Sequence, residues 1–179
     1  ITHLCKHYTT EGIDLDDNIL SVARERFPEM TFHQGNMIDF NLEHKFDIIT
    51  SLFSAIGYVK TVDALNQTAV NFAKHLKPDG GAIIETWFKP EDIKPRPISA
   101  IFVDEPELKV SRINHGITVK GNISSFTLHY LVGTPEDIEY FTEDHELGLF
   151  THEQYMSAFN DAGLETIYDP EGLMGRGLY

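Results

Sequence analysis

The chain has 179 residues, enough for one domain with a substantial core. It carries 28 acidic against 14 basic residues, a formal net charge of -14, which opposes nucleic acid as a partner because phosphates must be neutralised by clustered lysine and arginine. No run approaches the roughly 20 apolar residues of a membrane helix. The lone Cys5 cannot form an internal disulfide, so we expect a cytoplasmic protein with a small-molecule partner, no nucleic acid and no membrane.

Strand and helix patterns alternate over the first part of the chain. Residues 11–15 alternate apolar and acidic side chains, which predicts a short strand, and Asp16 is a suitable N-cap for a helix that stops at Pro28. Residues 30–35 then predict a second strand, closed by a turn. A short helix is also expected at residues 4–8.

The next segment predicts another unit in which a helix connects two strands. Residues 45–53 are continuously apolar at their centre, as in a parallel strand buried on both faces. A helix is predicted over residues 62–76, with an apolar stripe that includes Val70 and with proline and glycine ending it at residues 77–81. Residues 82–87 read as another buried strand.

The hydrophobic period changes to two between residues 103 and 150, with turn signals at Gly116, Gly121 and Gly133. This predicts an antiparallel insert over residues 103–150. A helix over residues 151–162 and a strand over residues 164–168 follow. The whole predicts one α/β domain, residues 1–179, with a Rossmann-like, doubly wound, mainly parallel sheet and the insert lying over the carboxyl ends of its strands.

Asp14 ends the first predicted strand. In an open α/β sheet an acid at this place accepts both ribose hydroxyls of an adenosine, although it equally serves as a cap for the following helix. Taken alone, Asp14 does not separate these two interpretations.

Four segments in order resemble the motifs of class I S-adenosylmethionine (SAM) dependent methyltransferases: GIDLDDNIL at residues 12–20, HQGNM at 33–37, FDIITS at 46–51 and LKPDGG at 76–81. The resemblance implies SAM as the cofactor, with Asp14 on the ribose, Asn36 and Met37 beside the adenine, and Ser51, Leu52 and Phe53 beside the methionine part. Two departures stand out. No glycine precedes Gly12, so the first strand and glycine-rich loop of the family are absent from this sequence, and Asn36 stands where the family often has aspartate.

Further segments resemble the N,N-dimethyltransferases that act on dTDP-linked 3-amino-deoxysugars: FSAIGY at 53–58, ETWFKPE at 85–91, NH at 114–115, FTEDHE at 141–146 and GRGL at 175–178. This resemblance implies N-methylation of an amino sugar nucleotide. It makes His115 the catalytic histidine, and an imidazole suits the removal of a proton from a sugar ammonium near neutral pH. The expected substrate-binding residues are Tyr58, Trp87, Phe88, His145 and Arg176.

Each of these residues also has a plainer interpretation. His115 would otherwise cap a hairpin, Phe88 would pack in the core, and Arg176 would be an exposed loop arginine. His3 and His7 lie four apart around Cys5, but no further ligands accompany them, and we predict no metal site.

Two other functions stay open at this point. One is a non-catalytic SAM-binding or interaction domain, which the absent glycine loop favours. The other is an NAD(P)-dependent oxidoreductase, which Asp14 would also suit but which the absence of G-x-G-x-x-G opposes. A homodimer is compatible with the sequence.

Overall fold

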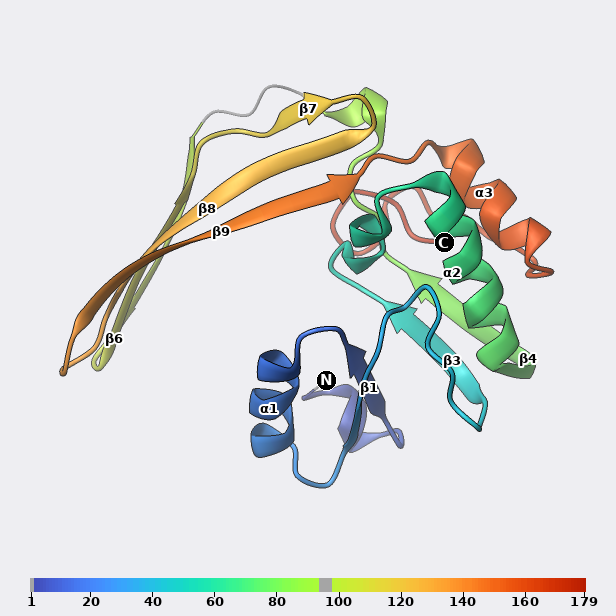
Figure 1. The fold of residues 1–179 in the computed structure, drawn as a ribbon, viewed down its shortest axis with the longest axis horizontal. Coiled ribbons are helices and arrows are strands. Elements are labelled where there is room, and N and C mark those ends of the chain that lie inside the picture. The colour runs from blue at the N-terminus through green and yellow to red at the C-terminus, as the bar shows by residue number, and fades with distance from the viewer. Residues whose placement is uncertain (1, 94–97) are drawn as a thin grey trace.

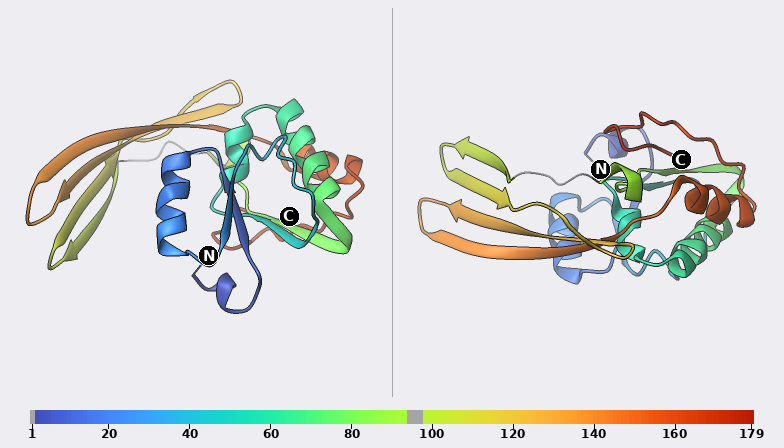
Figure 2. Two further views of the ribbon diagram at one scale, coloured as in Figure 1. Left: turned by 60° about the horizontal axis from the view of Figure 1, so that its bottom comes forward. Right: turned by 90° about the horizontal axis from the view of Figure 1, so that it is seen from above.

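The computed structural model describes residues 2–93 and 98–179. Figure 1 shows an α/β body and a long antiparallel sheet that projects from it. The two views of Figure 2 show that the far half of this sheet extends beyond the body, past α1 (Asp17–Arg26). Within the described part of the chain, no helix is long and apolar enough to cross a membrane.

The body begins with a strand, helix and strand. As predicted, β1 (Glu11–Asp14) and β2 (Thr31–Gln34) are strands, and they pair in parallel on either side of α1 in the sequence. The Asp16 side chain caps α1 by accepting a hydrogen bond from the backbone N–H of residue 18 at 2.8 Å. The helix ends two residues before Pro28, which fits the inability of proline to continue a helix.

A second parallel pair consists of β3 (Phe46–Ser51) and β4 (Leu76–Ile84), connected through α2 (Val62–His75). The helix ends before residues 77–81, as predicted, but β4 begins at Leu76 rather than at residue 82 and includes these residues. The strand accommodates them through an irregular register opposite β3 and a left-handed backbone at Asp79, whose φ is 64°.

The four parallel strands form two separate two-stranded sheets in the described residues, β1 with β2 and β3 with β4. The prediction that residues 45–53 are buried on both faces is wrong. Ile48 of β3 is 53% exposed, so one face of this strand is open to solvent in the structure. Val70 was also expected to lie in the apolar stripe of α2, but it is 57% exposed and lies on the solvent side of the helix.

The hydrophobic core lies where α2 packs on α3 (His152–Asp161) and on the short helix η2 (Ala55–Val59). Figure 1 shows the two long helices side by side over β3 and β4. Fully buried side chains at the centre are those of Ile56, Leu65, Ala69, Ile84, Phe150 and Tyr155.

The antiparallel sheet is longer than the predicted segments and begins before residue 103. Its strands are β5 (Ser99–Glu105), β6 (Leu108–Asn114), β7 (Thr118–Lys120), β8 (Ile123–Gly133) and β9 (Ile138–Gly148). The strand order is β5-β6-β8-β9, with β7 pairing the start of β8. Gly116 and Gly121, two of the expected turn glycines, have φ of 63° and 62°.

Two short 3-10 helices lie outside this sheet, η1 (Leu4–Lys6) and η3 (Pro90–Asp92).

The C-terminal part returns to the body. Thr151 caps α3 in a capping box with Gln154, which satisfies two backbone donors at the helix start. The predicted strand over residues 164–168 is wrong, because this segment forms no ladder with another described strand. Instead Tyr179 exchanges two backbone hydrogen bonds with Ile84, at 2.9 and 3.0 Å, along the edge of β4.

Candidate active site

Two polar side chains lie at the carboxyl ends of β1 and β2. Asp14 is the last residue of β1, and its Oδ1 accepts a hydrogen bond from the backbone N–H of Asp16 at 2.9 Å. Asn36 follows β2, and its Oδ1 accepts from the backbone N–H of residue 38 at 3.0 Å, which leaves its amide NH2 to donate elsewhere. Because β1 and β2 are parallel neighbours, these side chains share one edge of the sheet. Met37 packs against the core.

The turn after β3 has an unusual backbone. Ser51 ends the strand, is 6% exposed, and its Oγ has no hydrogen-bond partner among the described residues. Phe53 and Ser54 have φ of 53° and 65°, in the left-handed region that costs free energy for a residue other than glycine. The Phe53 side chain is nonetheless 79% exposed at this edge, directly after Leu52. Strain of this kind is typical of segments shaped for binding.

Glu85 organises the neighbouring strand end, and the sequence analysis did not assign it a separate role. Its side chain is 1% exposed, and one carboxylate oxygen accepts from the backbone N–H of Phe53 at 2.6 Å. The other oxygen accepts from Nη2 of Arg176 at 3.0 Å. The sequence does hold a sign of this role, because Glu85 comes directly after the apolar residues at the end of β4. A charge at such a buried place needs partners.

Arg176 and the aromatic residues after β4 form one cluster. The guanidinium of Arg176 lies over the rings of Trp87 and Phe88, 5.6 and 5.8 Å from their centroids, so it is not an exposed loop arginine. Nε1 of Trp87 donates to Oγ of the buried Ser124 at 2.8 Å, and its ring stacks on Phe126 at 5.7 Å. Trp87 therefore attaches the antiparallel sheet to the body.

An open cleft of about 780 Å³ lies where the near end of the antiparallel sheet meets η2. Its walls bring together three of the residues expected at the site, Tyr58, His115 and His145. Phe126 and His129 of β8 also line it, and neither is among the substrate-binding residues predicted from the sequence. Trp87, Phe88 and Arg176 do not line this cleft, although Trp87 stacks on Phe126, which does.

Tyr58 and His145 contact each other across the cleft. The Tyr58 hydroxyl lies 2.8 Å from Nδ1 of His145, and Nε2 of the same ring lies 3.5 Å from a carboxylate oxygen of Glu143. Burial, and secondly the negative charge of Glu143, raise the pKa of Tyr58 above its ordinary value. The phenol is therefore protonated at neutral pH. His115 is exposed in the loop between β6 and β7 and forms no hydrogen bond with another described residue.

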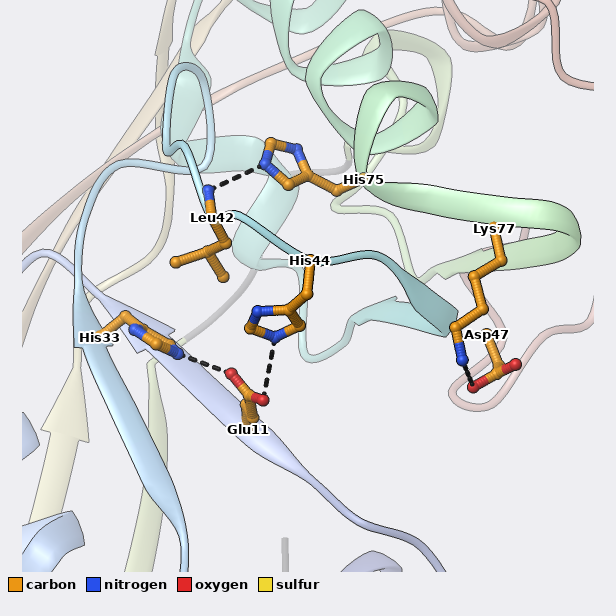
Figure 3. A network of polar contacts seen from close by, with 7 residues as sticks. All are labelled: Glu11, His33, Leu42, His44, Asp47, His75 and Lys77. Carbon is orange, nitrogen blue, oxygen red and sulfur yellow. Dashed lines mark hydrogen bonds and ion pairs between the residues drawn. The ribbon is translucent and has the colours of Figure 1, made fainter.

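A separate cluster surrounds Glu11 at the amino end of β1 (Figure 3). Its two carboxylate oxygens contact Nε2 of His33 at 2.6 Å and Nε2 of His44 at 3.0 Å. The same view shows His75 accepting from the backbone of residue 42. This end of the strand is opposite to the one that carries Asp14. Over residues 2–93 and 98–179, no group of three or more histidine, cysteine or acidic side chains is arranged to hold a metal ion.

The side chains at the carboxyl ends of the strands fit an adenosyl cofactor. Asp14 presents a carboxylate that accepts hydroxyl protons, Asn36 presents an amide donor, and the buried Oγ of Ser51 is unpaired among the described residues. Asp14 and Asn36 lie at the carboxyl ends of β1 and β2, and Ser51 lies at the carboxyl end of β3 in the second sheet. Nucleotides bind at the carboxyl ends of strands in open α/β sheets. The fold and these strand ends together indicate a Rossmann-like enzyme that uses a nucleotide cofactor.

Comparison with known proteins identifies the class. Residues 1–80 match the protein family described as “Methyltransferase domain”. The chain is 37% identical to the dTDP-3-amino-3,4,6-trideoxy-alpha-D-glucopyranose N,N-dimethyltransferase of Streptomyces venezuelae, over 99% of this chain and 77% of that protein. It is 36% identical to the dTDP-3-amino-3,6-dideoxy-alpha-D-glucopyranose N,N-dimethyltransferase of Streptomyces fradiae, over 100% of this chain and 71% of that one.

Two solved structures share the fold over almost all of this chain. Streptomyces venezuelae DesVI superposes with a TM-score of 0.93 and 36% identity, over 99% of this chain and 75% of that one. SAM-bound CalS10, an amino pentose methyltransferase from Micromonospora echinaspora, superposes with a TM-score of 0.85 and 32% identity, over 97% and 74%. The chain belongs to the SAM-dependent methyltransferases, in the family that contains these sugar N-methyltransferases. The predicted α/β fold, enzyme class and cofactor are confirmed, and the oxidoreductase alternative is wrong.

Proposed function

We propose that this enzyme transfers methyl groups from SAM to the amino group of a dTDP-linked amino sugar. The relatives at 36–37% identity are named for this reaction, and the similarity extends over almost the whole chain. The geometric observation that carries the proposal is the cleft. Its lining includes Tyr58 of η2, which follows the turn after β3, together with His115 and His145 of the antiparallel sheet region.

SAM supplies an electrophilic methyl group on its sulfonium. On the protein side, we assign Asp14 to the ribose and Asn36 with Met37 to the adenine. The turn formed by Ser51, Leu52 and Phe53 is assigned to the methionine part, and the exposed Phe53 ring suits contact with a cofactor at this edge.

The acceptor amine must present a free electron pair, and a sugar ammonium near neutral pH is mostly protonated. We assign the general base to His115, which faces the cleft from the loop before β7. Replacing His115 with alanine should lower kcat most strongly near neutral pH, where the amine still carries its proton and an unprotonated imidazole can accept it. A folded His115→Ala enzyme with the wild-type turnover number at every pH would rule this role out.

We assign Tyr58 and His145 to the wall of the acceptor pocket, and Trp87, Phe88 and Arg176 to the nucleotide end of the substrate. An arginine whose guanidinium lies over two aromatic rings is a suitable partner for a diphosphate. Arg176→Ala should therefore raise KM for the sugar nucleotide far more than KM for SAM. Equal increases in both constants would contradict the assignment.

The sheet over residues 103–150 is proposed to act as a substrate-covering insert within one domain, and its far half is proposed as a homodimer surface. Phe102, Leu131 and Ile138 are exposed and share one face of that half, since the ladder aligns alternate residues. Light scattering of the wild type against a Phe102→Glu variant tests the dimer. A wild-type monomer at micromolar concentration would reject it. We further propose a cytoplasmic enzyme that binds no nucleic acid.

Titration with S-adenosylhomocysteine by calorimetry, followed by a methyl-transfer assay with dTDP-amino sugars, tests the function in two steps. Binding at a ratio of one to one and transfer to the amine nitrogen are expected. Cofactor binding without transfer to any amino sugar nucleotide would reject the substrate class while keeping the cofactor site.

A further inference from the structure

We propose that Tyr58, His145 and Glu143 form a proton relay that carries a proton away from the acceptor amine. This inference rests on the proposed N-methyltransfer and names a second proton acceptor in the same cleft, beside His115. The three side chains come from η2 and from β9, so the relay joins the body to the covering sheet.

The hydrogen-bond direction in this chain follows from its chemistry. A protonated phenol at 2.8 Å from Nδ1 donates its hydrogen to that nitrogen. In a neutral imidazole the ring proton then sits on Nε2, the nitrogen that faces the carboxylate of Glu143 at 3.5 Å. At that distance the contact with Glu143 is electrostatic rather than a full hydrogen bond, and Nε2 is buried without another partner among the described residues.

The His145 ring is also fixed in orientation. It stacks on Phe126, with centroids 5.1 Å apart and planes at 22°, and its side chain is only 22% exposed. Tyr58, in contrast, is 48% exposed and lines the cleft, so its oxygen is the member of the chain that a substrate reaches. The arrangement resembles a carboxylate, imidazole and hydroxyl series in which each group orients the next.

The proposed step balances without a redox change. An N–H bond of the acceptor ammonium breaks and an O–H bond forms at Tyr58, while the original hydroxyl proton of Tyr58 passes to Nδ1 of His145. The nitrogen keeps the electron pair that attacks the methyl group. His145 becomes an imidazolium, and the adjacent carboxylate of Glu143 stabilises its charge.

A second histidine and tyrosine pair on the same sheet provides a matched control. Nδ1 of His129 lies 2.7 Å from the hydroxyl of Tyr140, and these rings are also stacked. No carboxylate lies within 4.0 Å of His129 in the described part of the chain, and Tyr140 does not line the cleft. Removing the hydroxyl of Tyr140 therefore tests the loss of such a hydrogen bond without touching the relay.

The kinetic test compares Tyr58→Phe, His145→Asn and Tyr140→Phe in the full protein, with SAM and a dTDP-amino sugar. We expect Tyr58→Phe and His145→Asn each to lower kcat about a hundredfold near neutral pH, with KM for SAM unchanged. The double variant should be no slower than either single one, because both interrupt one chain. Tyr140→Phe should match the wild type.

The pH dependence separates a relay from a structural role. The loss in Tyr58→Phe should shrink as pH rises, because solvent then deprotonates the amine and the relay is no longer needed. The other titratable or charged groups around the relay are unchanged in the variant: Lys60, His115, His129, Asp144 and Glu146 at the cleft, and Tyr130 and Arg112 near Glu143. A loss that is equal at all pH values, or no loss, would overturn the relay.

The tautomer of His145 gives a readout that needs no substrate. Nitrogen NMR of the wild type should show a neutral ring protonated at Nε2, and the signal of Nδ1 should shift in Tyr58→Phe. A ring protonated at Nδ1 would overturn the relay whatever the substrate is. Failure of the wild type to methylate any amino sugar nucleotide would instead reject the proposed function, so the two failures are distinguishable.

Discussion

The buried ion pair between Glu85 and Arg176 should be a main determinant of stability at the strand ends. Its atoms are 3.0 Å apart, and the two side chains are 1% and 15% exposed. Removing one partner leaves the other charge without compensation in a region of low dielectric, which costs about 3–5 kcal/mol. We therefore expect Arg176→Met to lower the free energy of unfolding by this amount, although methionine keeps the apolar contacts with the aromatic rings.

The matched control is the exposed pair of Arg24 and Asp17, whose atoms are 3.1 Å apart and whose side chains are 44% and 67% exposed. Arg24→Met makes the same chemical change where water screens the charges, so it should cost less than about 1 kcal/mol. Urea unfolding followed by circular dichroism measures both. The reasoning is refuted if Arg176→Met costs no more than Arg24→Met.

The double variant Glu85→Gln with Arg176→Met separates the pair from its surroundings. It leaves no unpaired charge, so its loss should be smaller than the sum of the two single losses, with a coupling of about 1–3 kcal/mol. Strictly additive losses would show that the two side chains stabilise the fold independently. Glu85→Gln alone should also weaken the bond to the backbone N–H of Phe53 and so disturb the turn assigned to the cofactor.

Three further predictions concern single side chains. Ser124→Ala leaves the indole N–H of Trp87 without its acceptor and should cost about 1–3 kcal/mol in urea unfolding; an unchanged midpoint would contradict the bond. Burial raises the pKa of Tyr155, so the unfolded chain releases this proton first and stability is lost as pH rises above about 10. Tyr155→Phe should reduce that alkaline loss, and equal losses in both proteins would refute it. Asp14→Asn should weaken S-adenosylhomocysteine binding about tenfold or more in calorimetry, because a charge-assisted hydrogen bond is lost; unchanged affinity would remove Asp14 from the site.

The local elements were accessible from the sequence because their signals are local. The cap at Asp16, the glycines with positive φ at Gly116 and Gly121, and the switch to a period of two all depend on neighbouring residues. The burial of β3 was overestimated, since an apolar run does not reveal whether other elements cover both faces of the strand. The segment over residues 164–168 likewise has strand-forming side chains but no strand partner within the described residues.

The candidate site shows the same division. Asp14 and His145 were identified through motifs that stand in the sequence, and the structure places Tyr58, His115 and His145 around one cleft. Glu143 was not singled out, because its relation to Tyr58 depends on the register of β9 and on how the sheet packs against η2. That information is carried by pairs of residues distant in the chain, which no local pattern encodes.

The central claim is methyl transfer from SAM to the nitrogen of a dTDP-linked amino sugar. The most direct measurement incubates the full protein with SAM and a dTDP-3-amino-deoxysugar and follows the sugar nucleotide by mass spectrometry. The account predicts products that carry one and then two methyl groups on nitrogen, together with S-adenosylhomocysteine. A sugar nucleotide that stays unmethylated, in a protein that binds S-adenosylhomocysteine, would contradict it.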